Sequence, residues 1–396
     1  MKRPLGLTCV ASPPLTQGGL GAGVVHGLVS LTVGTLGPPI GLELKIARVC
    51  PHDRGLPVLA DAFRAVAEAT GARDSVIFAG RHSTGVARAG PEPVHALRSP
   101  WPDLVGAFSG VASLLGGEDE GRTVWLLLVV ETAVTEVTPA AIQALQGLVD
   151  LGAGVDIICT HPAADMGLLS RLAQRTGGEL IQASAAEIVE RMVRRVGLLR
   201  DQRLRGARLD VRTPRGVRIQ RVFRVDPTPA FVGLLPASAD ASLLLPVGPV
   251  SAEAPPAWLI SAMTPGRGPG RYRLFDVSLR YQQGPETLGA EASASQTLVA
   301  EPPRMLPVEA AVNAALSRVD TAAWIEEIAR AYQGHDARRV AGLLDRLVRH
   351  AVTLDDRALV SRAFDLRLSF LRSGVLEPTD LNALRRHGAA SSRAAG

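Results

Sequence analysis

Between residues 42 and 200, short apolar segments alternate with longer segments in which apolar residues recur every three or four positions. The apolar segments predict β-strands at residues 42–49, 75–79, 124–130, 155–159 and 179–182. The segments between and after them predict helices at about residues 57–69, 101–115, 139–151, 165–176 and 185–199. This alternation is typical of βα units around a mostly parallel sheet. We therefore expect a doubly wound α/β domain over residues 39–202.

After about residue 203 the pattern changes to short, β-rich segments separated by Pro and Gly turns. These segments predict strands at residues 208–211, 217–225, 242–247, 258–263 and 272–281. Short strands with such turns are typical of an antiparallel β-sandwich. Residues 5–11 and 24–33 have the same character although they precede the α/β segment. We therefore expect residues 1–38 to supply strands to a sandwich completed by residues 203–302, with the α/β domain inserted into it.

The helical period returns from Pro307 onward. It predicts helices at about residues 307–317, 321–333, 336–352, 356–373 and 378–386. We expect a C-terminal helical module over residues 303–388, made of short amphipathic helices with little internal core, that offers its apolar grooves to a partner. The Ala-, Ser- and Gly-rich residues 389–396 are expected to form a disordered tail.

The composition excludes several classes of protein. With 46% hydrophobic and 20% charged residues, the chain is an ordinary globular protein, and with 4% aromatic residues and a net charge of +5 we expect no nucleic-acid partner. No apolar run is long enough to cross a membrane. Cys9, Cys50 and Cys159 are too few and too scattered for a disulfide framework or a zinc cluster, which favours a reducing, cytoplasmic setting.

Polar residues follow two of the predicted parallel strands and are the first candidates for a site. Ligands of α/β folds usually bind at the carboxyl ends of the strands. We therefore expect a partner-binding rim made of the residues after strands 42–49 and 124–130, namely Cys50, His52, Asp53, Arg54, Glu131 and Thr132.

Asp53 and Glu131 are the metal candidates of this rim. Two carboxylates without hydroxyl ligands leave most of an octahedral shell to water, so any affinity for magnesium would be weak. The alternative is that both are solvated loop residues. We expect no metal and no cofactor.

A second candidate lies at the end of the predicted strand 155–159. Cys159 and His161 are placed there as a thiolate and imidazole dyad would require. No orienting acid is recognisable beside them, and the alternative is a buried cysteine followed by a loop histidine.

The segment from residue 42 to Glu131 resembles the von Willebrand factor A (VWA) fold with its metal site erased. In that family a loop reading Asp-x-Ser-x-Ser, a distant Thr and an Asp after the fourth strand hold one divalent cation. By position, Val49 replaces the Asp of this loop, Pro51 its first Ser and Asp53 its second Ser. Glu131–Thr132 stands where the family has Thr-Asp-Gly, and residues 100–103 contain no Thr. The resemblance thus implies a degenerate metal-ion-dependent adhesion site.

The whole order of elements resembles a group of bacterial, notably actinobacterial, VWA proteins, as do Pro14–Gly19, Cys50 and Arg212–Arg218. In that group the metal site binds magnesium and a partner's carboxylate. Members are often encoded beside MoxR-type AAA+ ATPases, protein kinases or tellurite-resistance-type proteins.

Together the residues and the resemblance predict a non-enzymatic interaction or scaffold component of a bacterial multi-protein system. One alternative is a weakly magnesium-dependent adaptor for a MoxR-type AAA+ ATPase. A more distant alternative is an enzyme built on Cys159 and His161.

Overall fold

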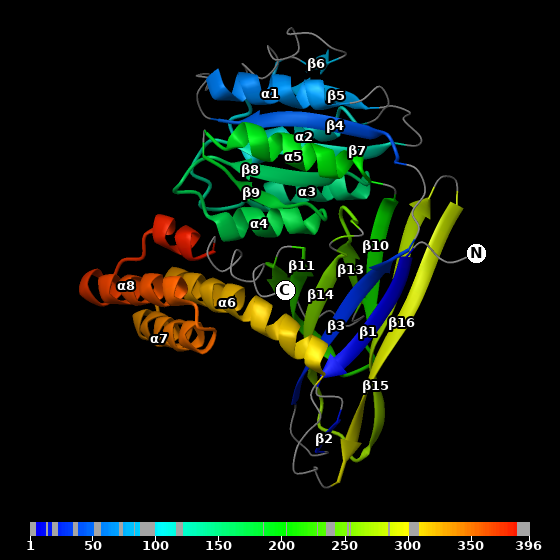
Figure 1. The fold of residues 1–396 in the computed structure, drawn as a ribbon, viewed down its shortest axis with the longest axis vertical. Coiled ribbons are helices and arrows are strands. Elements are labelled where there is room, and N and C mark those ends of the chain that lie inside the picture. Colours follow the sequence, from blue (N-terminus) through cyan, green and yellow to red (C-terminus); the bar gives the residue numbers. More distant parts are fainter. Residues whose placement is uncertain are drawn as a thin grey trace.

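The protein consists of an α/β unit, a β-sandwich beside it and a helical region that contacts both (Figure 1). A computed structural model describes residues 5–12, 15–17, 23–34, 39–50, 57–70, 74–82, 84–87, 100–115, 122–184, 186–202, 204–227, 229–234, 242–251, 253, 255–283, 286–300 and 309–385.

Among these residues, six strands form the sheet of the α/β unit, in the order β6-β5-β4-β7-β8-β9. They are β4 (Leu42–Val49), β5 (Ser75–Ala79), β6 (Thr84–Ala87), β7 (Thr123–Val130), β8 (Gly154–Cys159) and β9 (Leu180–Gln182). All neighbouring strands are parallel except β5 and β6, which are antiparallel. The edge strand β6 is the one strand of this sheet that the sequence did not predict.

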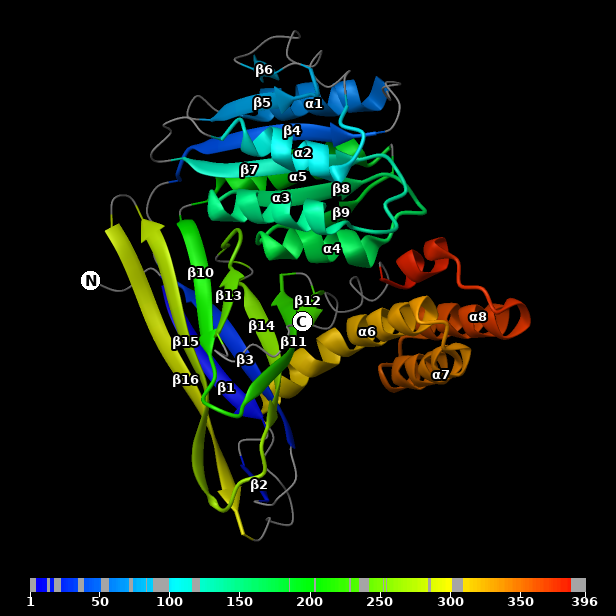
Figure 2. The same cartoon turned by 180° about the vertical axis from the view of Figure 1, so that it is seen from behind.

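Helices cover both faces of this sheet (Figures 1 and 2). They are α1 (Pro57–Ala69), α2 (Leu104–Ala112), α3 (Pro139–Asp150), α4 (Met166–Arg175) and α5 (Ile188–Arg200). Helices α1 and α5 share one apolar cluster with the sheet, and α2, α3 and α4 share another. Because both faces are covered, the strands are nearly continuous apolar runs. The predicted doubly wound α/β architecture is confirmed.

The sandwich consists of two sheets whose described strands have the orders β1-β3-β14-β11-β12 and β13-β10-β15-β16-β2. The strands are β1 (Leu5–Ser12), β2 (Leu15–Gln17), β3 (Gly23–Val33), β10 (Arg205–Arg212), β11 (Arg218–Asp226), β12 (Ala230–Leu234), β13 (Ser242–Pro246), β14 (Ala257–Thr264), β15 (Gly270–Gln283) and β16 (Glu286–Val299). Strand β3 precedes the α/β unit and pairs with β14, which follows it. The predicted insertion into an antiparallel sandwich is therefore confirmed.

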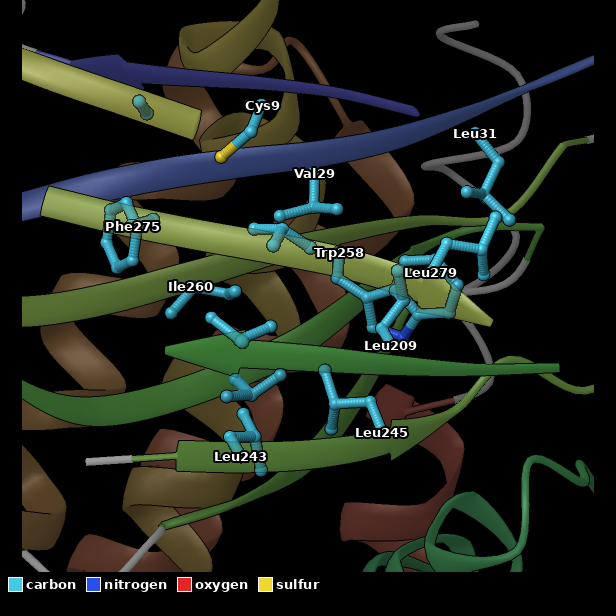
Figure 3. Close-up of a cluster of buried hydrophobic side chains, with 14 of the residues drawn as sticks. Cys9, Val29, Leu31, Leu209, Leu243, Leu245, Trp258, Ile260, Phe275 and Leu279 are labelled. Atoms are coloured by element: carbon cyan, nitrogen blue, oxygen red, sulfur yellow. The ribbon is translucent and has the colours of Figure 1, made fainter. Parts of the chain in front are cut away.

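The core of the sandwich lies between its two sheets. Figure 3 shows side chains from both sheets in this cluster, among them Cys9, Val29, Trp258 and Phe275. Strand β3 approaches β15 closely at Gly27, where a Cβ atom would lie 2.6 Å from the ring of Phe275. Strand β3 is thus built into the interior of its sheet, whereas β1 and β2 lie at the edges of their sheets.

The helical region differs from the prediction at its first element. The helices predicted at residues 307–317 and 321–333 form one continuous helix, α6 (Ala310–Gln333). The residues between them include no Gly or Pro, so nothing in the backbone ends the helix there. Val319 at this point is buried against the sandwich, and its neighbour Arg318 pairs with Asp226 at 2.7 Å.

Helix α6 joins two apolar clusters. Its first half packs Val312, Ala315 and Val319 on the outer face of the sandwich, against residues such as Phe223 and Leu259. Its second half forms a separate core with α7 (Ala337–Thr353), α8 (Arg357–Ser373) and a short helix at residues 378–385. The expectation of a module with little internal core was wrong. Helix α6 is long enough to pack on the sandwich with its first half and to form an internal core with α7 and α8 with its second half. The predicted disordered tail, residues 389–396, lies outside the described residues.

Candidate functional site

The candidate rim lies at the point where the connections of the parallel sheet change direction. Strand β4 has β5 on one side and β7 on the other, so the chain leaves β4 toward one edge and later returns to its opposite side. Ligands of such sheets bind outside the carboxyl ends of these two strands. Cys50 follows β4 there, and Glu131 and Thr132 follow β7. His52, Asp53 and Arg54 lie outside the described residues.

The described part of the rim is joined by backbone hydrogen bonds. The N–H of Glu131 donates to the carbonyl oxygen of Val49 at 3.0 Å. The N–H of Cys50 donates to the carbonyl oxygen of Trp101 at 3.0 Å. The N–H of Trp101 donates to the carbonyl oxygen of Arg48 at 2.8 Å. The ends of β4 and β7 therefore meet, as the sequence predicted, and the segment before α2 joins them.

The carboxylate of Glu131 is bound by an arginine. Nε of Arg48, the penultimate residue of β4, donates to Oε2 of Glu131. The side chain of Arg48 is 3% exposed and that of Glu131 is 7% exposed. The alternative that Glu131 is a solvated loop residue is therefore wrong.

The ion pair of Arg48 and Glu131 disfavours the binding of a metal ion at Glu131. A magnesium ion bound at Glu131 would lie close to a fixed positive charge, and two cations near one carboxylate repel each other. The described rim does not fit the magnesium site that the VWA fold implies.

Residues 100–103, which were compared with the segment of the family's distant Thr, contribute the ring of Trp101 and the helix cap Asp103. The ring of Trp101 packs on Gly106 and Gly110 of α2, where a Cβ atom at Gly110 would lie 2.3 Å from it. The carboxylate of Asp103 accepts from the N–H of Gly106 at 2.7 Å and caps α2. These contacts are structural, and they leave the carboxylate of Asp103 committed to the helix.

Sequence reasoning missed Arg48 as a member of this site. The signal was an arginine at the next-to-last position of an otherwise mostly apolar strand, because an arginine is rarely buried without a partner. Glu131, at the end of the neighbouring strand, is that partner.

The dyad of Cys159 and His161 is not formed. The thiol of Cys159 is buried and donates to the backbone carbonyl of His161, with an Sγ–O distance of 3.6 Å. Nδ1 of the His161 ring accepts from the N–H of Ala163 at 3.3 Å. Burial raises the pKa of the Cys159 thiol to about 11, although the bond to His161 acts in the opposite direction. The thiol is therefore held in its protonated, unreactive form.

A cavity of about 60 Å³ lies at the opposite end of the sheet, between the α/β unit and the sandwich. Its lining includes Thr123 and Gly154, the first residues of β7 and β8, and Gln202 and Arg208 from the chain that enters the sandwich. The residues of the candidate rim are not part of this lining.

Comparison with solved structures shows which known fold this chain resembles. No family model matches the sequence, and no curated protein matches it. The structure is similar to a von Willebrand factor type A protein from Catenulispora acidiphila, with a TM-score of 0.68 and 14% identity over 92% of this chain and 89% of that one. It is also similar to the ArnB paralog VWA2 from Sulfolobus acidocaldarius, with a TM-score of 0.58 and 12% identity over 98% and 99%. The chain therefore has a VWA-like fold, together with the antiparallel sheets and the helical region.

Proposed function

We propose that this protein is a non-enzymatic interaction component of a bacterial multi-protein system, with a VWA-like unit that works without a metal ion. VWA folds commonly serve as protein-interaction domains. The observation that carries the proposal is the buried pair of Arg48 and Glu131. A guanidinium stands beside the carboxylate of Glu131, which by sequence position lies in the segment that supplies a cation ligand in VWA proteins of the usual type.

The cost of burying two charges favours an ion pair of Arg48 and Glu131 that stays formed. Taking two charges out of water is costly, and the cost is offset only while both partners are present. A bound metal would compete with Arg48 for Glu131 and leave the guanidinium buried without its carboxylate. In the proposed function the rim around Cys50–Arg54 and Glu131–Thr132 binds a partner directly, by shape and hydrogen bonding, while the carboxylate of Glu131 stays paired with Arg48.

Further observations support a role without catalysis. The thiol of Cys159 is buried with a raised pKa, and its geometry does not provide a nucleophile.

The described cysteines are free, which fits the cytoplasmic setting that we propose. Among the described helices, none is long and apolar enough to cross a membrane.

The test is the response of the full chain to magnesium. A ligand that binds only the native state at about 100 times its Kd adds roughly 2.7 kcal/mol of stability. We expect thermal unfolding to be the same in millimolar magnesium and in EDTA. Arg48→Ser is the informative variant, because it frees Glu131, and a magnesium response gained only in this variant would show that the guanidinium excludes the metal.

Partner capture provides the second measurement. The full chain is used as bait in an extract of its native host, once with magnesium and once with EDTA. We expect the same partners in both. Partners that are recovered only with magnesium, with an AAA+ ATPase among them, would overturn the proposal in favour of the weakly magnesium-dependent adaptor.

A further inference from the structure

The cavity between the α/β unit and the sandwich lies where the chain passes from one to the other. The N–H of Ile40 donates to the carbonyl oxygen of Gln202 at 2.9 Å, and the N–H of Thr123 donates to the carbonyl oxygen of Gly41 at 2.9 Å. Strands β10 and β13 of the sandwich reach the α/β unit at the same place (Figures 1 and 2). A ligand in this cavity would therefore contact both parts of the molecule.

Two buried polar side chains of the cavity lining have no hydrogen-bond partner among the described residues. They are Thr123, through its hydroxyl oxygen Oγ1, and Gln202, through its amide nitrogen Nε2. Thr123 is 7% exposed and Gln202 is 5% exposed. Leaving a buried polar group without a partner costs free energy, so nearly all such groups in native proteins bind protein, water or a ligand.

The other polar side chains of the lining show which chemistry is available. Nε1 of Trp125 already donates to Asp156 at 2.6 Å, and the hydroxyl of Thr176 already donates to the carbonyl oxygen of Ala173 at 2.8 Å. The remaining polar side chain is that of Arg208, and the described lining contains no Asp or Glu. The cavity therefore offers hydrogen-bond donors and a single positive charge, which favours an anion.

Helix α3 holds the guanidinium of Arg208 at the cavity wall. Nη2 of Arg208 donates to the carbonyl oxygen of Val149, in the last turn of α3, at 3.2 Å. A guanidinium has five N–H donors in a fixed plane. This bond therefore positions the side chain and leaves further donors for a ligand.

A second arginine adds positive charge beside the cavity. Arg208 on β10 lies directly opposite Arg280 on β15 and, on its other side, opposite Pro246. Side chains in opposite positions share a face of the sheet, and like charges there repel each other. Neither arginine forms an ion pair with a described carboxylate, whereas Arg212 on the same strand pairs with Asp210 at 2.8 Å. An anion bound at Arg208 would relieve this repulsion.

The volume of the cavity limits the size of the anion. The cavity has about 60 Å³ of space, and a single water needs about 10–15 Å³. It can therefore hold roughly four waters, or one oxyanion of about the same number of non-hydrogen atoms. Carboxylate and phosphate groups of this size accept paired hydrogen bonds from a guanidinium.

We infer that this cavity is a binding site for a small oxyanion, either a short carboxylate or inorganic phosphate. Arg208 is its charged anchor, and Thr123 and Gln202 donate to its other oxygens. Thr123 and Gln202 belong to the α/β unit and Arg208 belongs to the sandwich, so the bound anion links the two parts. The site is separate from the partner-binding rim, which lies at the opposite end of the sheet.

The test is the binding of acetate and of inorganic phosphate to the full chain, measured by isothermal titration calorimetry with sodium chloride holding the ionic strength constant. We expect a single site, and the anion with the lower Kd identifies the class of ligand. Arg208→Gln should weaken binding about tenfold or more, because it removes a hydrogen bond to a charged group. Arg212→Gln is the matched control on the same strand, outside the cavity lining, and should bind as the wild type does. Failure of both anions to bind, or equal binding by Arg208→Gln and the wild type, would overturn the inference.

Thr123→Val separates a ligand site from a structural role. It keeps nearly the same shape and removes a hydroxyl that has no described partner, so in chloride the variant should unfold at the same temperature as the wild type or higher. In the anion that binds, the wild type should gain more stability than the variant, because a ligand stabilises the native state that binds it. Phosphate also stabilises proteins in general through its exclusion from their surface. Equal gains in the two proteins would therefore show that the anion does not bind at Thr123, and the assignment of the site would be wrong.

Discussion

Arg195 on α5 donates two hydrogen bonds to the carboxylate of Asp156 on β8, with N–O distances of 2.7 and 2.8 Å. Asp156 is fully buried and also accepts from Nε1 of Trp125 at 2.6 Å and from the N–H of Glu179 at 2.7 Å. The carboxylate thus connects β7, β8, α5 and the turn before β9. It is a buried charge whose bonds are all made within the α/β unit.

Arg195→Met should destabilise the protein by about 3–5 kcal/mol, because it removes the guanidinium that donates two hydrogen bonds to the buried carboxylate of Asp156. Urea unfolding followed by circular dichroism measures this loss. Arg191→Met is the control, because the pair of Arg191 with Glu187 is about half exposed, and exposed ion pairs contribute little to stability. Equal effects of the two substitutions would contradict the structural role of the Asp156 carboxylate.

The three cysteines should differ in their reactivity with a thiol reagent. Burial raises the pKa of Cys9 to about 12, with a further contribution from Asp276, and that of Cys159 to about 11. Cys50 is only half-buried, at the rim. Because the thiolate is the reactive form, Cys50 should be modified in the native protein, and Cys9 and Cys159 only after unfolding.

Ellman's reagent followed by peptide mass spectrometry measures the order of cysteine modification. Cys50→Ser should abolish the fast phase of the reaction. Fast modification of Cys159 in the native protein would revive the enzyme alternative.

His26 should make the stability of the sandwich depend on pH. It lies on β3, with Nδ1 3.0 Å from the hydroxyl of Ser261 on β14, and burial lowers its pKa below the ordinary value of 6.5. The unfolded chain therefore binds a proton at a higher pH than the folded protein does. The contribution of His26 is fully present above pH 6.5 and is lost as the pH falls toward the folded pKa.

The pH dependence of His26 is measured as a difference between proteins. Thermal unfolding of the wild type and of His26→Gln is compared on both sides of pH 6.5. The wild type should lose more stability than the variant as the pH falls. Parallel curves for the two proteins would rule out the contribution of His26.

Most of the α/β unit could be predicted because its local signals agree with its tertiary structure. The strand predicted at residues 42–49 and the helix predicted at 57–69 have the predicted bounds. Strand β16 was missed because its residues, rich in Ala and Ser, have weak β-propensity, and it forms by pairing along the length of β15. Such long-range pairing leaves no local signal in the sequence.

The candidate site could be predicted only in part, for the same reason. The rule that ligands bind at the carboxyl ends of parallel strands placed Cys50 and Glu131 at one edge. The contact of Arg48 with Glu131 depends on the register of β4 against β7, in which Arg48 lies opposite Val129. The register is a property of the assembled sheet, so the sequence alone showed a charged strand residue without its partner.

The final prediction concerns the contact between the helical region and the α/β unit. Asn382 is 2% exposed, and its side-chain amide donates to the carbonyl oxygens of Pro162 and Ala164 at 3.1 and 2.9 Å. Asn382→Ala removes both hydrogen bonds and leaves the buried carbonyl of Ala164 without this donor, at a cost of about 1–3 kcal/mol. Hydrogen exchange should therefore become faster at residues 161–166 and 378–385.

The same experiment separates a local contact from a general loss of stability. Helix α7 and the buried face of α8 pack in the core of the helical region, which the helix at residues 378–385 joins through Leu381 and Leu384, so their exchange should change less than that of residues 378–385 in Asn382→Ala. Asn313→Ala, at an exposed position on α6, is the matched control and should alter neither segment. Faster exchange throughout the helical region would show instead that Asn382 supports the core of that region. An unchanged exchange pattern would show that the contact with residues 161–166 contributes little to holding the helical region against the α/β unit.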